Sequence, residues 1–437
     1  MSTYTPHTAS DIREMLDVVG VKSLKGLYEG LEGIFARDMN LPEGKSQQEV
    51  ARWFEELAAR NKVFGSVFLG AGAYQRYIPP VVKSLLSRSE FVTAYTPYQA
   101  EMSQGILQAI FEFQTMITEL TGMQVSNASL YDGSTALADG ILMLSERKKN
   151  KVLLSEAIHP YSIEVVKTYL LPLGFEVEMI ALEDGKTSLT DLEKKLSDDV
   201  FAVALAQPNF YGVIEDAAVI GEATKAAGSG YIMQVEPFAA TLLKTPFDCG
   251  ADIAVGEGQP LGMPLSYGGP YLGFIGAREK LTRRMQGRVV GKTQDAQGRD
   301  AYVLTLQARE QHIRREKASS SICSNQALCA LTATVCMAAV GKEGMKEVAR
   351  QSLSKAHYLA TEMTALDGFE LKYGSEFFNE FVAVSQAPAD LIIKKCAEKN
   401  ILAGLKLGTH EILWCATEVN TKEDIDRLVA TLKEVQP

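Results

Sequence analysis

The chain has 437 residues, of which 46% are hydrophobic and 22% are charged. This balance is that of an ordinary globular protein and argues against a disordered chain. The formal net charge of -10 argues against nucleic acid as a general partner, because phosphate binding needs a positive field. A chain of this length is expected to form two lobes.

Residues 1–60 are expected to form a helical N-terminal segment. Thr8 and Asp11 have the spacing of a capping box, and apolar residues follow at helical period at Ile12, Met15, Leu16 and Val19. No basic patch followed by an apolar run is found here, so we expect no signal peptide. The six cysteines lie in apolar contexts without a CxxC pair, which favours a reducing compartment, the cytoplasm, over a metal or disulfide site.

Residues 61–342 alternate between strand-like and helix-like runs and predict a large α/β domain with a mostly parallel sheet. Helices are expected between the strands, for example over 134–149 and 188–196. The strand-like runs occupy residues 152–154, 176–182, 201–208, 231–235, 252–255 and 271–276.

A smaller C-terminal α/β domain is expected over 343–437, joined to the large domain by a helix that runs from 327 to about 364. The uncharged stretch 318–341 begins with polar residues, and its apolar part is shorter than the roughly 20 residues of a membrane span. We therefore expect a buried helix and no membrane partner. Strands are expected over 377–385 and 411–417.

Two glycine-containing segments raise the question of phosphate binding. In GRVVGKT, residues 287–293, three residues separate the glycines where a Walker loop needs four, so a flexible loop is expected. Asp132, Gly133, Ser134 and Thr135 lie just before a predicted helix, where free amides and the helix dipole can hold an anion. The simpler alternative is an ordinary N-cap.

Two polar segments are further candidates for a site. Residues 95–105, YTPYQAEMSQG, form a polar aromatic loop, which is typical of sites, although a rigid proline turn that packs two rings is the alternative. Residues 308–326 carry five basic side chains. This run fits either a solvated helix face or a surface that captures carboxylates. The basic residues are Arg309, His312, Arg314, Arg315 and Lys317.

Five segments carry a resemblance to a known family. They are FLGAGAY at 68, YTPYQAEMSQG at 95, LTGMQVSNASLYDGSTA at 120, GEGQPLGMPLSYGGPYLGF at 256 and REQHIRREKASSSIC at 309. Through them the chain resembles the P-protein family of the glycine cleavage system along essentially its whole length. The chain shows no second homologous half, and in this it is similar to the split bacterial form. The resemblance therefore implies the first, alpha subunit of glycine dehydrogenase (decarboxylating), an oxidoreductase.

The resemblance implies the aspartate-aminotransferase fold, which is pyridoxal phosphate (PLP) fold type I. It also implies a reaction in which glycine condenses with PLP, carbon dioxide leaves, and the aminomethyl group passes to the lipoyl arm of H-protein. The implied partners are H-protein and a second, homologous subunit in an α2β2 assembly.

At Gln259 the sequence departs from the pattern of a complete PLP site. Alignment of Gln259 and Pro264 with the lysine-to-proline spacing of the catalytic subunit places Gln259 where the Schiff-base lysine would stand, and an amide cannot form an imine. On the preceding strand, Gln234 and Val235 stand around the expected aspartate, and Glu236 is the only acid. PLP is therefore expected to be bound by the partner subunit.

The resemblance further implies that this chain lends residues to the partner's site. The lent residues are expected to be Tyr95, Tyr98, Glu101, Gln104, Arg314, Ser320 and Ser321, and the loop of Gly133, Ser134 and Thr135 is a possible anion site. Three alternatives stay open: these residues only stabilise the interface, the chain is a self-sufficient PLP aminotransferase or decarboxylase, or it is a non-catalytic scaffold that docks H-protein.

Overall fold

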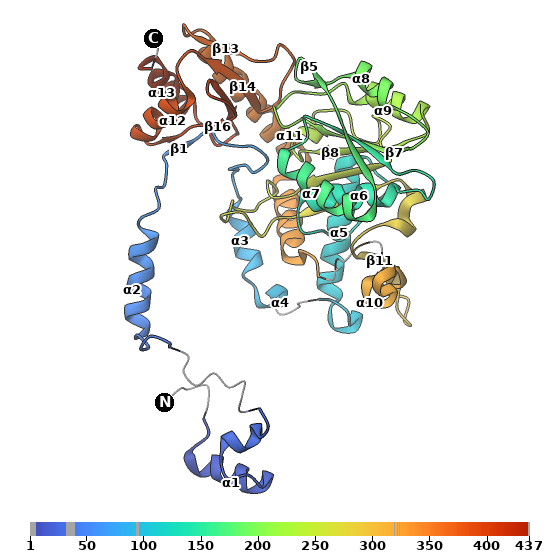
Figure 1. Ribbon diagram of the computed structural model, residues 1–437, viewed down its shortest axis with the longest axis vertical. Helices are drawn as coiled ribbons and strands as arrows, with labels where there is room; N and C mark the ends of the chain where they lie inside the picture. The colour runs from blue at the N-terminus through green and yellow to red at the C-terminus, as the bar shows by residue number, and fades with distance from the viewer. Residues whose placement is uncertain are drawn as a thin grey trace. The chain divides into compact units, whose positions relative to one another are not determined.

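A computed structural model describes residues 6–31, 40–92, 96–318, 320, 322 and 324–435. The chain divides into two compact units, residues 1–63 and 64–437, and each is described by itself. Figure 1 shows the course of the chain within them.

The first unit contains α1 (Ala9–Val19), the 3-10 turn η1 (Leu24–Tyr28) and α2 (Gln47–Ala58). The predicted capping box of Thr8 and Asp11 is confirmed, and Gly20 ends α1 in the left-handed conformation. A second capping box, Ser46 with Glu49, begins α2. The apolar residues of α2 recur at helical spacing, yet each stays at least 39% exposed, so the first unit does not cover this face. They are Val50, Trp53, Phe54 and Leu57.

The second unit is built on a seven-stranded sheet with the strand order β2-β10-β9-β8-β7-β3-β4. The predicted mostly parallel sheet is confirmed, because β10 is antiparallel to both of its neighbours whereas the five strands from β9 to β4 are parallel. The strands are β2 (Val125–Ser126), β3 (Lys151–Ser155), β4 (Glu176–Ile180), β7 (Val200–Gln207), β8 (Gly230–Val235), β9 (Ile253–Glu257) and β10 (Gly273–Ala277).

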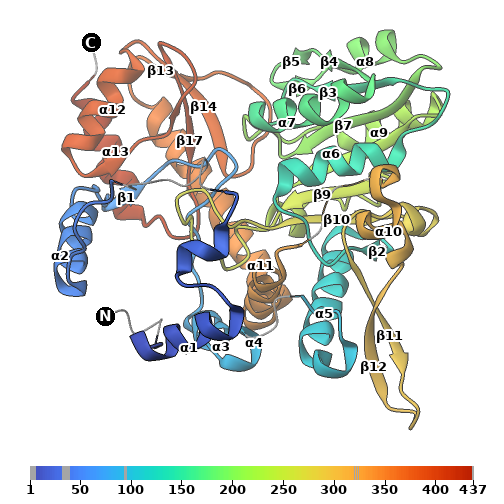
Figure 2. The ribbon, with the colours of Figure 1, turned by 60° about the horizontal axis from the view of Figure 1, so that its bottom comes forward.

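Helices cover both faces of this sheet (Figure 2), which explains why its central strands are almost continuously apolar. Successive side chains of a strand point to opposite faces. Val152 and Leu154 accordingly join the core beneath α6 and α7, whereas Leu153 joins the core on the opposite face. The helices are α5 (Gln104–Thr121), α6 (Gly133–Leu144), α7 (Pro160–Leu170), α8 (Leu189–Lys195) and α9 (Ala217–Ala226).

The long helix α11 (Ala327–Thr364) is the predicted buried helix. By length and composition it could cross a membrane, but half of its apolar window is buried inside the protein, where it packs against α5 and α3. Gly341, with φ of 70° and ψ of 169°, interrupts it. The predicted domain division after residue 342 lies beside this interruption and stays a prediction.

The C-terminal part folds around an antiparallel sheet with the order β13-β14-β17-β16. Trp414 on β17 is 1% exposed and lies in its core. The short strand β1 pairs in parallel with β15, so the start of the second unit is tied to its C-terminal part. The elements are β1 (Ser66–Val67), β13 (Phe369–Leu371), β14 (Glu380–Ser385), α12 (Ala389–Glu398), β15 (Ile401–Leu402), β16 (Leu405–Lys406), β17 (Glu411–Cys415) and α13 (Lys422–Lys433).

Short elements complete the second unit. They are α3 (Pro80–Leu86), α4 (Ser89–Val92), η3 (Ala100–Met102), η4 (Leu171–Leu173), β5 (Leu182–Glu183), β6 (Lys186–Thr187), η5 (Ala239–Thr241), η6 (Glu279–Arg284), η7 (Gln307–Arg309), α10 (Gln311–Arg314) and η8 (Arg315–Lys317).

The expected flexible loop around GRVVGKT is wrong, because residues 289–305 form a β-hairpin of β11 (Val289–Gln294) and β12 (Asp300–Thr305). At the turn, the Asp295 carboxylate accepts the amides of Gln297 and Arg299, at 2.8 and 2.9 Å. The polar half of β11 lacks the apolar pattern of a buried strand. This half of β11 is a strand because its backbone pairs with β12, the next element along the chain.

Gly212 offers a test of how tightly the two sheets are joined. Its φ is 83°, and a Cβ on it would collide with the backbone oxygen of Glu380 on β14. Gly174 has the same φ with no atom within 4 Å of that position. We predict that Gly212→Ala lowers the free energy of unfolding by about 4 kcal/mol or more, whereas Gly174→Ala lowers it by about 1 to 2 kcal/mol, the conformational term alone. Chemical unfolding of the purified variants measures both, and equal losses would contradict the predicted clash.

Candidate functional site

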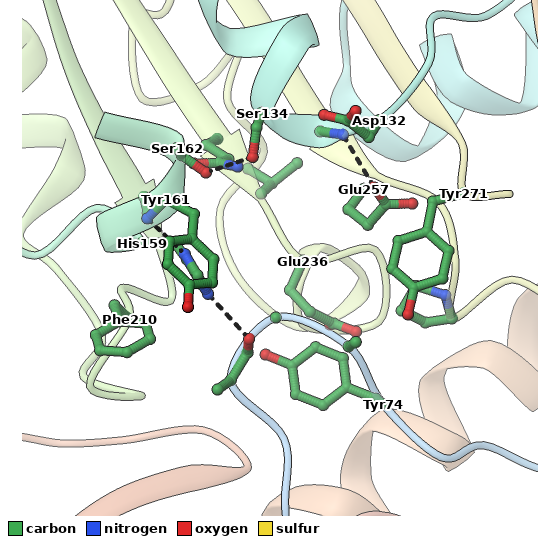
Figure 3. A pocket seen from close by; sticks show the side chains of 18 of the residues that line it. Tyr74, Asp132, Ser134, His159, Tyr161, Ser162, Phe210, Glu236, Glu257 and Tyr271 are labelled. Atoms are coloured by element: carbon green, nitrogen blue, oxygen red, sulfur yellow. Dashed lines mark hydrogen bonds between the residues drawn. The ribbon is translucent and has the colours of Figure 1, made fainter. Parts of the chain in front are cut away.

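A cavity of about 480 Å³ lies in the second unit at the carboxyl ends of β7, β8 and β9. The loop 71–74 and the starts of α6 and α7 complete its walls. Figure 3 shows Tyr161 and Tyr271 on opposite sides of it, with Glu236 and Tyr74 between them. Ligands of α/β sheets bind outside the carboxyl ends of the strands, so this cavity has the position of a binding site.

His159 forms one wall and is held as a neutral ring. Its Nδ1 accepts the amide of Tyr161 at 3.1 Å, so Nε2 carries the proton and donates it to the carbonyl of Ala71, also at 3.1 Å. The ring of Phe210 contacts it edge-on, with the centroids 4.9 Å apart. Burial lowers the pKa of His159. This wall is therefore aromatic and uncharged at neutral pH.

Gln259 is fully buried, and backbone groups fix its amide. Its Oε1 accepts the amide of Tyr74 at 2.9 Å, and its Nε2 donates to the carbonyls of Tyr74 and Met263 at 3.1 and 2.8 Å. Within the described part of the chain, no lysine lines the cavity. Lys280, which follows β10 in the sequence, pairs with Asp252 at 2.8 Å, at the amino end of β9 and so at the other end of this strand from the cavity.

The start of α6, the possible anion site, already holds carboxylates. The amide of Gly133 donates to Glu257 at 2.9 Å, and the amide of Thr135 donates to Asp132, the N-cap, at 2.8 Å. The hydroxyl of Ser134 lies 2.8 Å from that of Ser162. An incoming anion would have to displace a carboxylate from these amides.

Two further carboxylates border the cavity. Glu236 is paired with the buried Arg76 at 3.1 Å, and Arg76 also contacts Glu418 at 2.8 Å. Glu380 accepts the hydroxyl of Tyr74 and the amide of Ala71, both at 2.6 Å. Burial raises the pKa of Glu380 to about 7. Glu236, the one acid near the expected aspartate position, is thus engaged by a guanidinium.

These residues do not fit covalently held PLP. The cavity offers no lysine amine among the described residues, the amide that would receive a phosphate donates to Glu257, and Glu236 is bound by Arg76. The sequence pattern had singled out Gln259 and the start of α6. It had not singled out Glu257 or His159 as site residues, although Glu257 lies two positions before Gln259 and His159 lies directly before the first residue of α7.

Of the residues expected to be lent to a partner, Tyr95 and Ser321 lie outside the described residues. Tyr98 accepts a hydrogen bond from Arg288 at 2.6 Å, and Gln104 exchanges hydrogen bonds of 2.9 Å with the backbone of Tyr302 on β12. Gln104 is therefore held by the hairpin.

The other expected residues, Glu101, Arg314 and Ser320, occupy two kinds of surroundings. Glu101 and Arg314 are exposed, and Arg314 donates to the carbonyl of Ala308 at 3.3 Å. Ser320 donates to Asp139, a buried residue of α6, at 3.4 Å. None of the described residues expected to be lent lines the 480 Å³ cavity.

The structures that match this fold define its class. A C-DES mutant with glycine covalently linked to its PLP cofactor superposes with a TM-score of 0.64 at 16% identity, covering 90% of this chain and 100% of that chain. At that identity the likeness shows the fold alone. The predicted PLP fold type I is confirmed.

The family follows from closer relatives. The model of the glycine cleavage system P-protein matches residues 2–432. A crystal structure of glycine decarboxylase (P-protein) in an inhibitor-bound form superposes with a TM-score of 0.93 at 41% identity, covering 99% of this chain and 100% of that one. A probable glycine dehydrogenase (decarboxylating) subunit 1 from Desulfitobacterium hafniense is 48% identical over 444 residues, 99% of this chain and 100% of that protein. The chain belongs to the glycine cleavage system P-protein family, and the predicted enzyme class, an oxidoreductase, is confirmed.

Asp139 gives a test of the electrostatics beside Ser320. Its Oδ1 is buried without a hydrogen-bond partner, and burial raises its pKa from 3.8 to about 7. The folded state therefore binds a proton that the unfolded state has released, and the free energy of unfolding falls as pH rises from about 4 to 7. We predict that Asp139→Asn stabilises the chain, by about 2 kcal/mol more at pH 8 than at pH 5.

Chemical unfolding at the two pH values measures this difference. Asp198→Asn, at an exposed position, is the matched control and should change stability equally at both. A gain for Asp139→Asn that does not depend on pH would rule out a raised pKa at this carboxylate.

Proposed function

We propose that this chain is the subunit of a two-subunit glycine decarboxylase to which PLP is not linked. A second, homologous and lysine-bearing subunit binds PLP and glycine, in an α2β2 complex in the cytoplasm. With that subunit, the chain serves glycine decarboxylation and transfer of the aminomethyl group to the lipoyl arm of H-protein. The observation that carries the proposal is the buried amide of Gln259, which three backbone hydrogen bonds fix where the sequence alignment expects the lysine.

PLP, when bound by the partner, supplies the electron sink for decarboxylation. The residues of this chain would supply orientation and charge. The exposed Glu101 and Arg314 can reach another molecule, and the planar guanidinium of Arg314 suits a carboxylate. Tyr98 and Ser320 lie beside them in the sequence segments that carry the family resemblance, together with Tyr95 and Ser321.

The uncovered apolar face of α2 gives separate support to an assembly. Trp53 and Phe54 are 53% and 56% exposed. Aromatic side chains that stay exposed along one helix face are typical of interfaces between proteins. The first unit therefore offers a surface that a neighbouring subunit would cover.

The alternative that this chain is a self-sufficient PLP enzyme can be tested on the chain purified without a partner subunit. We expect it to lack the visible absorbance of lysine-bound PLP after incubation with the cofactor, because no lysine of the described residues lines the cavity. Borohydride treatment followed by mass spectrometry of the intact chain should show no reduced PLP adduct, whereas the co-purified second subunit should carry one. A stoichiometric adduct on this chain would refute the proposal.

The scaffold alternative is tested in the reconstituted complex with Glu101→Gln. If Glu101 faces the partner's site, its loss should reduce the exchange of carbon dioxide into glycine by at least about tenfold, the range of a lost charged contact. Glu112→Gln is the matched control, since Glu112 is an exposed glutamate on α5 whose carboxylate accepts a hydrogen bond from Gln108 at 3.0 Å. Unchanged exchange in both variants, with the complex intact by size-exclusion chromatography, would favour the scaffold.

A further inference from the structure

The 480 Å³ cavity contains a polar atom whose hydrogen bonding is incomplete. Gln234 lines the cavity from the end of β8, and its Oε1 is buried without a hydrogen-bond partner in the described structure. Because this oxygen is shielded from solvent, a donor in the cavity reaches it only when the Gln234 amide turns toward the cavity. Buried acceptors are nearly always satisfied, and one that is not commonly awaits a ligand or an ordered solvent molecule. An amide oxygen can only be satisfied by a donor.

The charges around this acceptor all favour a cation. Four carboxylates line the cavity, Asp132, Glu236, Glu257 and Glu380, and no lysine or arginine among the described residues does. The ion pair with Arg76 compensates Glu236. Three carboxylates therefore face the cavity without a cation among its lining residues, and an anion would be repelled.

Aromatic side chains form a further part of the cavity wall. Tyr74, Tyr131, Phe210 and Tyr271 line the cavity, and Tyr161, which is 77% exposed, lies where solvent reaches it. The faces of such rings attract cations and exclude water from an apolar body. Carboxylates together with rings describe a site for an organic cation.

We propose that this cavity is a binding site for a small organic cation, a primary ammonium group carried on an apolar body. A primary ammonium has three N–H donors, which can serve the Gln234 acceptor and the carboxylates together, whereas a quaternary ammonium has none. Amino acids fit less well, since their carboxylate would meet Glu257 or Glu380. The proposal rests on the residues of this cavity and does not depend on the proposed function.

The protonation of two carboxylates that line the cavity should make ligand binding depend on pH. Burial raises the pKa of both Glu257 and Glu380 to about 7. Asp132 and the paired Glu236 and Arg76 also face the cavity or border it, and His159 is neutral. As pH rises through 7 the two glutamates ionise, so an ammonium ion should bind more tightly at pH 8 than at pH 6.

Three molecules of the same shape test the choice of ligand: benzylamine, benzyl alcohol and benzoate. Titration calorimetry on the full-length chain, purified without a PLP-bearing partner, avoids reaction of the amine with the cofactor. We expect benzylamine to bind at one site per chain and at least about tenfold more tightly than the alcohol, with no binding of benzoate. Equal or tighter binding of benzoate, or no saturable binding of benzylamine, would overturn the proposal.

A cavity variant and a matched surface variant locate the site, with a second cavity variant in reserve. Gln234→Met keeps the length of the side chain and removes the acceptor, and it should weaken benzylamine binding at least about tenfold. Gln351→Met, at an exposed position of α11, is the matched control and should leave it unchanged. If Gln234→Met does not fold, Tyr161→Ala removes an exposed wall and should weaken binding severalfold. Unchanged affinity in the folded cavity variant would place the amine elsewhere and refute the site.

Discussion

The Glu257 carboxylate joins three parts of the second unit through hydrogen bonds to the amides of Gly133, Gln259 and Leu272, each 2.9 Å long. Gly133 begins α6, Gln259 lies in the turn after β9, and Leu272 directly precedes β10. One side chain thus sets the positions of the helix start, the turn and the returning strand. The three amides stabilise the ionised form of Glu257, whereas burial destabilises it. Burial has the larger effect and raises the pKa of Glu257 to about 7.

This arrangement changes what the carboxyl edge of the sheet can bind. A helix start whose amides are free is suited to phosphate. Here a carboxylate of the chain itself receives the first of those amides, and Asp132 receives another. The cavity keeps the position of a ligand site in this fold, but its charge favours ligands of the opposite sign. Gln259 adds to this change, because its amide is committed to the backbone of Tyr74 and Met263.

Much of the fold could be predicted from the sequence, because the signals are local. Capping residues such as Thr8 mark helix starts, and the continuously apolar run of β7 marks a strand covered on both faces. The hairpin of β11 and β12 could not be predicted, since its polar half has no hydrophobic period and exists through pairing.

Less of the candidate site than of the fold could be predicted, because many of its contacts join segments far apart in the chain. Gln259 was identified from its alignment with a lysine of the family. The burial of Glu257 and Glu380, by contrast, depends on segments far apart in the chain, such as Ala71 with Glu380. No pattern within a short window reports such contacts, nor which acceptors, such as that of Gln234, remain without a donor.

Arg76 draws together segments that a reader of the sequence would assign to different domains. Its guanidinium bonds Glu236 after β8, Ser352 on α11 and Glu418 after β17. A fragment that ended near residue 342 would therefore leave Arg76 without two of these acceptors, in a place shielded from water. Dissecting the polypeptide into separately expressed lobes is thus a poor strategy for studying either one, and the compact unit 64–437 retains the whole network.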